Sequence, residues 1–242
     1  MRRTNKVPEK KVRQLFDRIA ANYDTTNNVI SLGSHKKWRK KTMQQLALEP
    51  GGKVLDLCCG TGDWTIALAQ AVGSTGAVVG LDFSSEMLAI AKTKLAAANI
   101  FSQVTLLQGD AMELPFADNS FDVVTIGFGL RNVPDAAQVL REMQRVVVPG
   151  GMIACLETSQ PENRLIYPFW QLYFKLMPLI AKLKHNDKQD YVYLQQTTQH
   201  FFSAKQLETL FRSTGLIQTN YQSFMFGASC LHTGIKKERS KI

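Results

Sequence analysis

Short, continuous runs of apolar residues recur along the first two thirds of the chain. Strands of a parallel sheet that is covered on both faces read as such runs, because neither face meets water. The runs predict five buried strands, at residues 54–58, 77–81, 104–107, 123–126 and 152–156.

Helical periodicity separates these predicted strands. Apolar residues recur at helical spacing after the first two strands, and they are Trp64, Ala67, Leu68 and Ala71, followed by Met87, Leu88, Ala91 and Leu95. Ser84 and Ser85 come just before the second set, where a serine can cap the first turn. Pro134 suits the first turn of a third helix, whose buried face is predicted to carry Val139, Leu140, Met143 and Val147. Strands that alternate with helices predict a doubly wound α/β sheet.

The C-terminal part has a different pattern. Ser203 and Gln206 have the spacing of a capping box at the start of a helix. Two further strands are predicted at residues 216–224 and 228–235, and the few residues between them are too short for a helical crossover. These strands should therefore pair antiparallel. A mostly parallel, seven-stranded sheet that ends in an antiparallel hairpin is typical of class I methyltransferases, and not of dehydrogenases.

The remaining segments divide the chain into a cap and a main domain. Residues 1–45 are predicted to form a helical N-terminal cap or lid, and residues 46–242 the methyltransferase domain. Residues 161–200 read as an insertion over the carboxyl edge of the sheet, where open α/β folds bind ligands. The apolar stretch 165–181 contains Pro168, Lys175 and Pro178, and it falls short of the roughly 20 apolar residues that a membrane-spanning helix needs.

Composition and charge narrow the class of protein. The 242 residues, 45% hydrophobic and 20% charged, are enough for one sizeable core. The four cysteines lack the spacing of a metal site, so no metal is expected and a reduced, cytoplasmic setting fits. No signal peptide is expected from the polar N-terminal residues. A net charge of +9 favours an anionic partner, for which nucleic acid and an anionic lipid surface both qualify.

A glycine turn follows the first predicted strand. Asp56 lies in that strand, and Gly60 and Gly62 come just before the first helix, an arrangement that lets the backbone approach a ligand closely. No third glycine follows at the spacing of the dinucleotide fingerprint, and no GK[ST] follows either. The turn is therefore not predicted to bind a pyrophosphate.

Carboxylates follow the next two predicted strands. Asp82 ends the second strand and can accept hydrogen bonds from both hydroxyls of a ribose, while Asp110 follows the third and can accept from an adenine amino group. For either aspartate alone, a helix cap or a surface charge is an equally good explanation. Three acidic residues at successive strand ends instead indicate an adenosine without phosphates, and hence S-adenosylmethionine.

Longer motifs carry a resemblance to a known family. Residues 23–39 read YDTTNNVISLGSHKKWR, residues 126–133 read IGFGLRNV and residues 145–151 read RVVVPGG. LETSQP at residues 156–161 and YLQQ at 193–196 continue the match. The chain resembles the ubiquinone/menaquinone biosynthesis C-methyltransferases from about Val12 to Lys236, and within them the branch that methylates demethylmenaquinol. Thr26 and Val148 depart from the family pattern, which has a methionine and a basic residue there.

The resemblance implies a cofactor site and a reaction. It implies S-adenosylmethionine as cofactor, S-adenosylhomocysteine as product and a polyprenyl naphthoquinol as substrate. The cofactor contacts implied are Thr61, Asp82, Asp110 and Ala111, with Gly60 and Gly62 added by the turn geometry. Asp56 is expected to orient the glycine loop or the cofactor's ammonium group.

The polarity of the reaction suggests the catalytic residues. A sulfonium methyl is electrophilic, so the acceptor must be the electron-rich quinol and not the quinone. Arg131 is the first candidate for stabilising the quinol anion, because a nearby cation lowers the pKa of a phenol. Arginine cannot itself be the base. A water held by Arg131 and Asn132, His35, and Tyr23 all remain candidates for the base.

The partners follow from the same reasoning. The aromatic residues of the insertion, Tyr167, Phe169, Trp170, Tyr173 and Phe174, can pack in a core or receive the isoprenoid tail. With the basic N-terminal stretch they predict peripheral association with the inner face of the cell membrane, and the sequence leaves a homo-oligomer open. Methylation of a benzoquinol is the alternative within the family. An RNA methyltransferase is the alternative from another class. Residues 127–132 contain neither the base-holding motif nor the nucleophilic cysteine that such an enzyme would need, so no nucleic-acid partner is expected.

Overall fold

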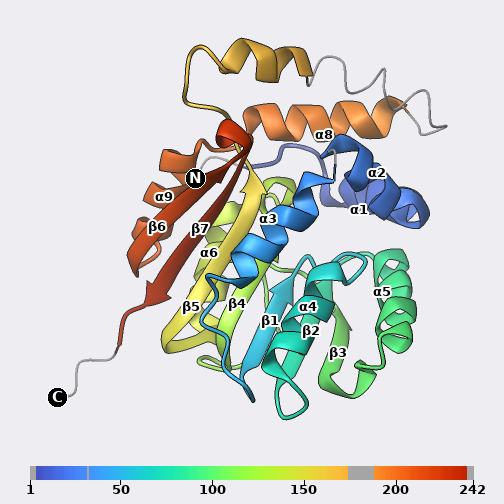
Figure 1. Ribbon diagram of the computed structural model, residues 1–242, viewed down its shortest axis with the longest axis vertical. Helices are drawn as coiled ribbons and strands as arrows, with labels where there is room; N and C mark the ends of the chain where they lie inside the picture. The colour runs from blue at the N-terminus through green and yellow to red at the C-terminus, as the bar shows by residue number, and fades with distance from the viewer. Residues whose placement is uncertain (1–3, 32, 174–187, 239–242) are drawn as a thin grey trace.

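The computed structural model describes residues 4–31, 33–173 and 188–238. Within them, the strands form one seven-stranded sheet in the order β3-β2-β1-β4-β5-β7-β6 (Figure 1). The strands are β1 (Lys53–Leu57), β2 (Ala77–Asp82), β3 (Val104–Gln108), β4 (Phe121–Gly127), β5 (Val147–Thr158), β6 (Leu216–Phe224) and β7 (Ser229–Lys236). The first five pair in parallel, whereas β7 lies antiparallel between β5 and β6. The predicted fold class is confirmed.

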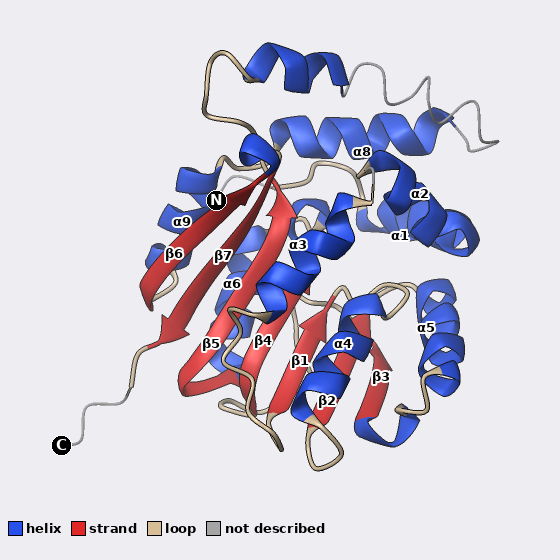
Figure 2. Cartoon of the chain, in the orientation of Figure 1, coloured by secondary structure: helices blue, strands red, loops and turns tan. Residues whose placement is uncertain are grey.

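Helices cover both faces and one edge of this sheet (Figure 2). They are α1 (Glu9–Ile19), α2 (Tyr23–Ile30), α3 (Ser34–Met43), α4 (Asp63–Val72), α5 (Ser85–Ala97), α6 (Ala136–Val146), α8 (Lys188–His200) and α9 (Ala204–Ser213). Residues 167–173 are also helical. Short 3-10 turns are η1 (Ala20–Asn22), η2 (Phe101–Gln103), η3 (Leu130–Asn132) and η4 (Met225–Gly227).

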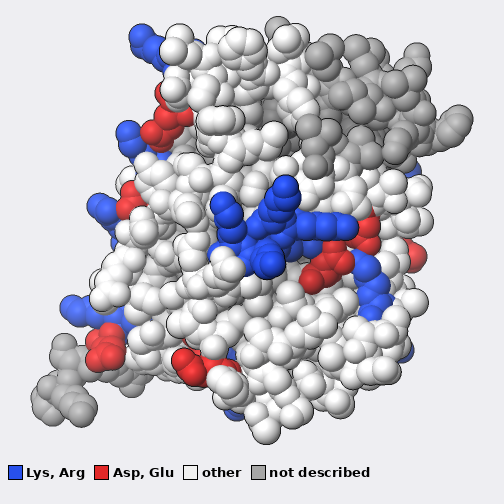
Figure 3. All heavy atoms as spheres, in the orientation of Figure 1, with Lys and Arg blue, Asp and Glu red and all other residues white. Residues whose placement is uncertain are grey.

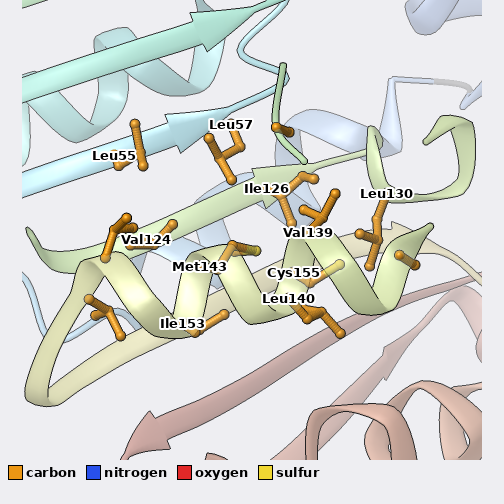
Figure 4. Packing of buried hydrophobic residues seen from close by; sticks show 14 of the residues in the cluster. Leu55, Leu57, Val124, Ile126, Leu130, Val139, Leu140, Met143, Ile153 and Cys155 are labelled. Carbon is orange, nitrogen blue, oxygen red and sulfur yellow. The ribbon is translucent and has the colours of Figure 1, made fainter. Parts of the chain in front are cut away.

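The alternation of side chains along each strand builds a core on each face of the sheet. Leu55 and Leu57 of β1 belong to the cluster that packs against α6 and α9 (Figure 4). Val54, the residue before Leu55, belongs to the cluster on the opposite face, with Leu68 of α4. A fully buried leucine contributes about 1.5–3 kcal/mol. Burial on both faces explains why the parallel strands read as continuous apolar runs.

The helices α1 and α2 lie over the end of the sheet at which the parallel strands finish, while α3 runs across one face of the sheet (Figure 1). Val12 and Phe16 of α1 pack in one cluster with Met87 of α5 and Tyr193 of α8. The side-chain amide of Asn5 donates to the Tyr193 hydroxyl and to the backbone oxygen of Asn132, both at 2.9 Å. The first segment of the chain is thereby fixed beside the strand ends where ligands bind in open α/β folds.

Capping residues in the sequence predicted some helix ends correctly and others not. The Ser84 cap is confirmed by its bond from Met87 N, and the capping box of Ser203 and Gln206 is also present. The prediction that the third helix starts at Pro134 is wrong, because the side chain of Asp135 caps a helix that begins at Ala136. Val147 does not belong to that helix but begins β5. Residues 174–187, with Phe174, Lys175 and Pro178 of the predicted insertion, lie outside the described residues.

Candidate active site

The chain turns sharply where β1 ends. Cys58, Gly60 and Gly62 have φ angles of 51°, 57° and 82°, in the left-handed region that glycine adopts without a steric penalty. A Cβ on Gly62 would lie 3.0 Å from the Cβ of Ala91 in α5. Glycine at this position therefore lets α4 begin directly against α5, and the backbone of the turn faces the strand ends.

Asp82 ties this turn to the end of β2. Its Oδ2 accepts a hydrogen bond from Gly60 N at 2.8 Å, and its Oδ1 accepts one from Ser84 N at 2.9 Å. Burial raises the pKa of Asp82 to about 6, although the backbone donors lower it in part. The carboxyl group lines a cavity of about 770 Å³. A fixed acidic group thus forms part of the wall of a cavity large enough for a small-molecule ligand.

The same cavity extends to the end of β3. Asp110 and Ala111 line it, and the Oδ1 of Asp110 accepts a hydrogen bond from Met112 N at 2.8 Å. Asp110 is exposed, whereas Ala111 is buried. Of the residues predicted to bind a cofactor, the structure brings four together around this cavity, and they are Gly60, Asp82, Asp110 and Ala111.

Asp56 lies inside the sheet. It accepts hydrogen bonds from the hydroxyls of Thr65 at 2.7 Å and Thr125 at 2.9 Å, so it joins β1 to α4 and β4. Burial raises the pKa of Asp56 to about 6. The described residues that line the 770 Å³ cavity do not include Asp56, Thr61 or Gly62. Their predicted contacts with a cofactor stay predictions.

Thr61 takes part in a polar network that the sequence did not indicate. Its hydroxyl donates to Asp24 Oδ1 at 2.7 Å, and Lys94 Nζ donates to Asp24 Oδ2 at 2.7 Å. Lys94 also donates to Asp63 Oδ1, while Arg39 Nη1 donates to Asp63 Oδ2 at 2.8 Å. Burial would raise the pKa of Asp63, but the bonds from Lys94 and Arg39 outweigh it and lower that pKa.

We call Asp24, Arg39, Asp63 and Lys94 the ionic latch. It joins α2 and α3 of the N-terminal segment to α4 and α5 beside the glycine turn. The four residues are far apart along the chain, and each lies in an ordinary polar position of a helix, so no local signal could have predicted the network.

A second cavity, of about 300 Å³, lies between α3, α8, η4 and the helical residues 167–173. Most of its lining is apolar, and Arg131 contributes a charge. The guanidinium Nη1 donates to Glu157 Oε1 at 2.5 Å, and the backbone N–H of Arg131 donates to Glu157 Oε2 at 3.1 Å. Glu157 is 1% exposed, and among the described residues the Nε of Arg131 has no hydrogen-bond partner.

Phe128 lines both cavities. Its φ of 56° is rare for a residue with a side chain, and such backbone conformations cluster at functional sites. A Cβ on the neighbouring Gly129 would lie 2.4 Å from the Cβ of Cys58, so glycine is required where the β1 and β4 turns meet. The sequence motif contained Phe128 and Glu157, but local pattern gave no reason to assign either of them a role.

The four predicted catalytic residues divide between the two cavities. Tyr23 and Asn132 line the larger one, and His35 and Arg131 line the smaller one. Burial raises the pKa of Tyr23, whose phenol therefore keeps its proton at neutral pH. Burial and the nearby Arg39 lower the pKa of His35 to about 4, so its imidazole is neutral at pH 7.

The side chain of Asn132 is held by α8. Its side-chain oxygen accepts a hydrogen bond from the Tyr193 hydroxyl at 3.1 Å, and its side-chain amide donates to Phe128 O at 3.3 Å. Burial raises the pKa of Tyr193 to about 12, which keeps that hydroxyl a donor. Asn132 thus connects α8 to the loop that carries Phe128.

The described residues also bear on other kinds of site. Over residues 4–31, 33–173 and 188–238, no group of three or more histidine, cysteine or acidic side chains is placed to hold a metal ion. In those same ranges, no helix combines the length and the apolar character needed to cross a membrane.

Comparison with known sequences gives a consistent result. The sequence model of the ubiE/COQ5 methyltransferase family matches residues 4–236. The chain is 53% identical over 229 residues to a Lactiplantibacillus plantarum protein named demethylmenaquinone methyltransferase, covering 94% of this chain and 97% of that protein. It is 49% identical over 235 residues to the Staphylococcus aureus (strain JH9) protein of the same name, covering 97% and 96%.

Solved structures share the fold at low sequence identity. A complex of the Haloferax volcanii Trm112 methyltransferase activator with a methyltransferase matches with a TM-score of 0.70 and 22% identity, over 96% of this chain and all of that one (100%). The Haemonchus contortus phosphoethanolamine N-methyltransferase 2, solved with S-adenosyl-L-methionine, matches with a TM-score of 0.63 and 17% identity, over 84% of this chain and 53% of that one.

Proposed function

Because the chain belongs to the ubiE/COQ5 methyltransferase family, we propose that it transfers a methyl group from S-adenosylmethionine to a ring carbon of demethylmenaquinol. The products are menaquinol and S-adenosylhomocysteine, and the reaction is the last step of menaquinone synthesis. The observation that carries the proposal is the pair of unlike cavities, one with carboxylates in its wall and one mostly apolar, both lined by Phe128. A polar cofactor and an apolar acceptor need one cavity of each kind.

The larger cavity fits the cofactor. When bound, S-adenosylmethionine supplies an electrophilic methyl carbon on a sulfonium, and acidic walls suit this cation. Asp82 has lone pairs for the ribose hydroxyls, and Asp110 with the N–H of Ala111 suits the adenine edge. The turn formed by Gly60, Thr61 and Gly62 lets the backbone approach the ligand. In this proposal Asp56 positions the first turn of α4, which follows the glycine turn, by accepting a hydrogen bond from Thr65.

The smaller cavity suits a quinol ring with an apolar tail. Deprotonation of a quinol hydroxyl places electron density on the ring carbon beside it, whereas the oxidised quinone is electron-poor. Glu157 balances the charge of Arg131, so we infer that Arg131 acts chiefly as a directed donor through its free Nε. A hydrogen bond from a charged donor contributes about 1.5–3 kcal/mol and favours the anionic oxygen.

The hydroxyl proton of the acceptor must pass to a group that lines one of the two cavities. The candidates are a water held by Arg131 and Asn132, the imidazole of His35, and Tyr23. The raised pKa of Tyr23 makes it a proton donor at neutral pH, which suits a hydrogen bond to a ligand better than proton removal.

Purified protein with methyl-labelled cofactor tests the function. We expect transfer of label to demethylmenaquinol, which gives labelled menaquinol, in the presence of a reductant and little transfer without one. The benzoquinol counterpart and bulk RNA serve as the competing acceptors. Faster labelling of the benzoquinol would move the chain to the other branch of its family, and labelling of RNA alone would refute the proposal. Equal rates with oxidised and reduced naphthoquinone would refute the quinol as the true acceptor.

A polyprenyl substrate should bring the protein to a membrane surface on the cytoplasmic side. Lys36, Lys37, Lys40 and Lys41 are exposed on α3, and Figure 3 shows basic side chains gathered over this helix. Phe169 and Phe226, 74% and 78% exposed, line the smaller cavity on which α3 also borders. A lysine near anionic lipid contributes about 1 kcal/mol. We expect co-sedimentation with anionic vesicles that weakens in salt, and binding indifferent to lipid charge would contradict this.

A further inference from the structure

The connection between α2 and α3 brings a serine hydroxyl to a histidine ring. Ser31 follows α2, Gly33 makes the turn with a φ of 72°, and His35 is the second residue of α3. The Oγ of Ser31 lies 2.6 Å from the Nδ1 of His35. The same Oγ lies 2.7 Å from the backbone oxygen of Asn27, to which it donates a hydrogen bond. Both Ser31 and His35 line the smaller cavity.

These two distances fix the position of the imidazole proton. A serine hydroxyl carries one proton, and a backbone carbonyl can only accept. The proton of Ser31 therefore points to Asn27 O, and the short contact with His35 is a hydrogen bond only if Nδ1–H donates it. A neutral imidazole has one N–H, so Nε2 carries the lone pair. In the opposite tautomer Nδ1 would be an acceptor, and the single proton of Ser31 could serve only one of its two neighbours. Either Nδ1 at 2.6 Å or Asn27 O at 2.7 Å would then face the Oγ of Ser31 without a proton between them.

Burial, together with the charges around it, keeps the His35 ring neutral. On its own helix, Lys36 and Arg39 disfavour the imidazolium, while Asp63 of α4 and Asp24 of α2 favour it. Burial adds the largest effect, and the resulting pKa of about 4 leaves a neutral ring above about pH 5. Arg131 of η3 faces the same cavity with its charge balanced by Glu157.

Among the described side chains that line this cavity, the imidazole of His35 is the one that offers an uncharged nitrogen lone pair at neutral pH. The titratable lining residues of the cavity within the described part of the chain are His35, Arg39, Arg131 and Tyr173. A guanidinium keeps its protons. The Tyr173 hydroxyl donates to the backbone oxygen of Ile30, and burial raises its pKa. The elimination leaves the imidazole.

We propose that the Nε2 of His35 is the general base that removes the acceptor hydroxyl proton, and that Ser31 is the positioning residue that holds the ring in the Nδ1–H tautomer. This assignment rests on the proposed function. The O–H bond breaks, its proton goes to Nε2, and its electron pair becomes the new carbonyl bond as the ring carbon bonds to the methyl group. The C–S pair returns to sulfur, which gives S-adenosylhomocysteine. The proton on Nε2 then returns to the oxygen while the C–H proton leaves to water, so one proton is released overall.

The tautomer can be measured without turnover. Long-range ¹H–¹⁵N spectra of the full chain, labelled at its four histidines, distinguish Nδ1–H from Nε2–H imidazole, and the His35→Gln spectrum assigns the signals. We expect Nδ1–H at His35 in the parent and in Ser31→Thr, and a mixed or reversed tautomer in Ser31→Ala. An Nε2–H signal in the parent would overturn the proposal, whatever the protein methylates.

Kinetics then tests the role. We expect His35→Gln to lower kcat about 10²–10⁴-fold, the range for a lost general base, with the calorimetric affinity for S-adenosylmethionine unchanged. Its residual rate should rise with pH as the acceptor ionises unaided, whereas the parent stays flat above about pH 5.5 because the pKa of its base is about 4. Ser31→Ala should lower kcat about 10-fold with little change in KM, about the factor expected for one lost neutral hydrogen bond, and Ser31→Thr should restore it.

The matched control is His200→Gln, at an exposed histidine of α8 outside both cavities. The kcat and the pH profile of this variant should match those of the parent. A His35→Gln enzyme with the parent's kcat and pH profile would overturn the base assignment and leave the activity intact. A parent that methylates no quinol would instead refute the proposed function, and the tautomer measurement would still stand.

Discussion

Replacing Glu157 by glutamine removes the counter-ion of a buried guanidinium. Glu157 is 1% exposed and accepts bonds from Arg131 Nη1 at 2.5 Å and from Thr158 N at 2.7 Å. With charge centres roughly 4 Å apart and an effective dielectric constant of about 20, the lost attraction is about 4 kcal/mol. Breaking one side of a buried pair typically costs about 3–5 kcal/mol. We expect Glu157→Gln to lower the free energy of unfolding by this amount.

A double-mutant cycle in urea, followed by circular dichroism, separates the charge effect from local damage. Arg131→Met alone leaves the carboxylate without its partner and should also destabilise. The double variant Arg131→Met/Glu157→Gln buries no charge and should lose at least about 2 kcal/mol less than the sum of the single variants. Additive losses, within about 0.5 kcal/mol, would show that water reaches the pair and would refute the reasoning.

Three further changes test the larger cavity and its surroundings. Lys94→Met opens the ionic latch and should weaken S-adenosylmethionine binding about 5-fold in calorimetry, with the parent approaching the variant in high salt; unchanged affinity would contradict a link between cap and turn. The parent's affinity for the cofactor should fall as pH drops through about 6, because protonation of Asp82 removes the anion that the cation prefers, and Asp82→Asn should bind weakly at every pH; a flat profile for the parent would contradict the role of Asp82. Gly129→Ala should lower the free energy of unfolding by about 1–3 kcal/mol, since its Cβ would lie 2.4 Å from that of Cys58, and Cys58→Gly in the same chain should restore it; a single variant as stable as the parent in urea would contradict the close approach.

Regular repetition made the sheet predictable. The parallel strands β1, β2 and β4 are mostly buried, so each one appears as an apolar run in the sequence. The antiparallel strand β6 was also predicted with its observed ends. Element ends that depend on one side chain were less predictable. Both Pro134 and Asp135 are acceptable near the start of a helix, and only the bond from Gln138 N to Asp135 Oδ1 decides between them.

The site was predictable only where strand order alone brings residues together. Asp82 and Asp110 end neighbouring parallel strands, so their meeting in one cavity follows from topology. The pairing of Arg131 with Glu157 crosses from η3 to β5, and the ionic latch joins four helices. Neither leaves a periodic signal, because each depends on how loops pack at the strand ends.

The two cavities treat charge in opposite ways, and this difference suits the reaction. The larger one presents Asp82 and Asp110 to a cationic ligand. In the smaller one both arginines are paired, Arg131 with Glu157 and Arg39 with Asp63, and the imidazole is neutral.

Attack of an anionic ring carbon on a sulfonium methyl cancels two charges in the transition state. An apolar chamber without net charge favours that transition state over the separated ions. An unpaired guanidinium would do the reverse, because it would stabilise the anion before reaction and repel the sulfonium. We therefore infer that Glu157 serves catalysis as well as stability, so that any Glu157→Gln protein that remains folded should bind the quinol more tightly and methylate it more slowly.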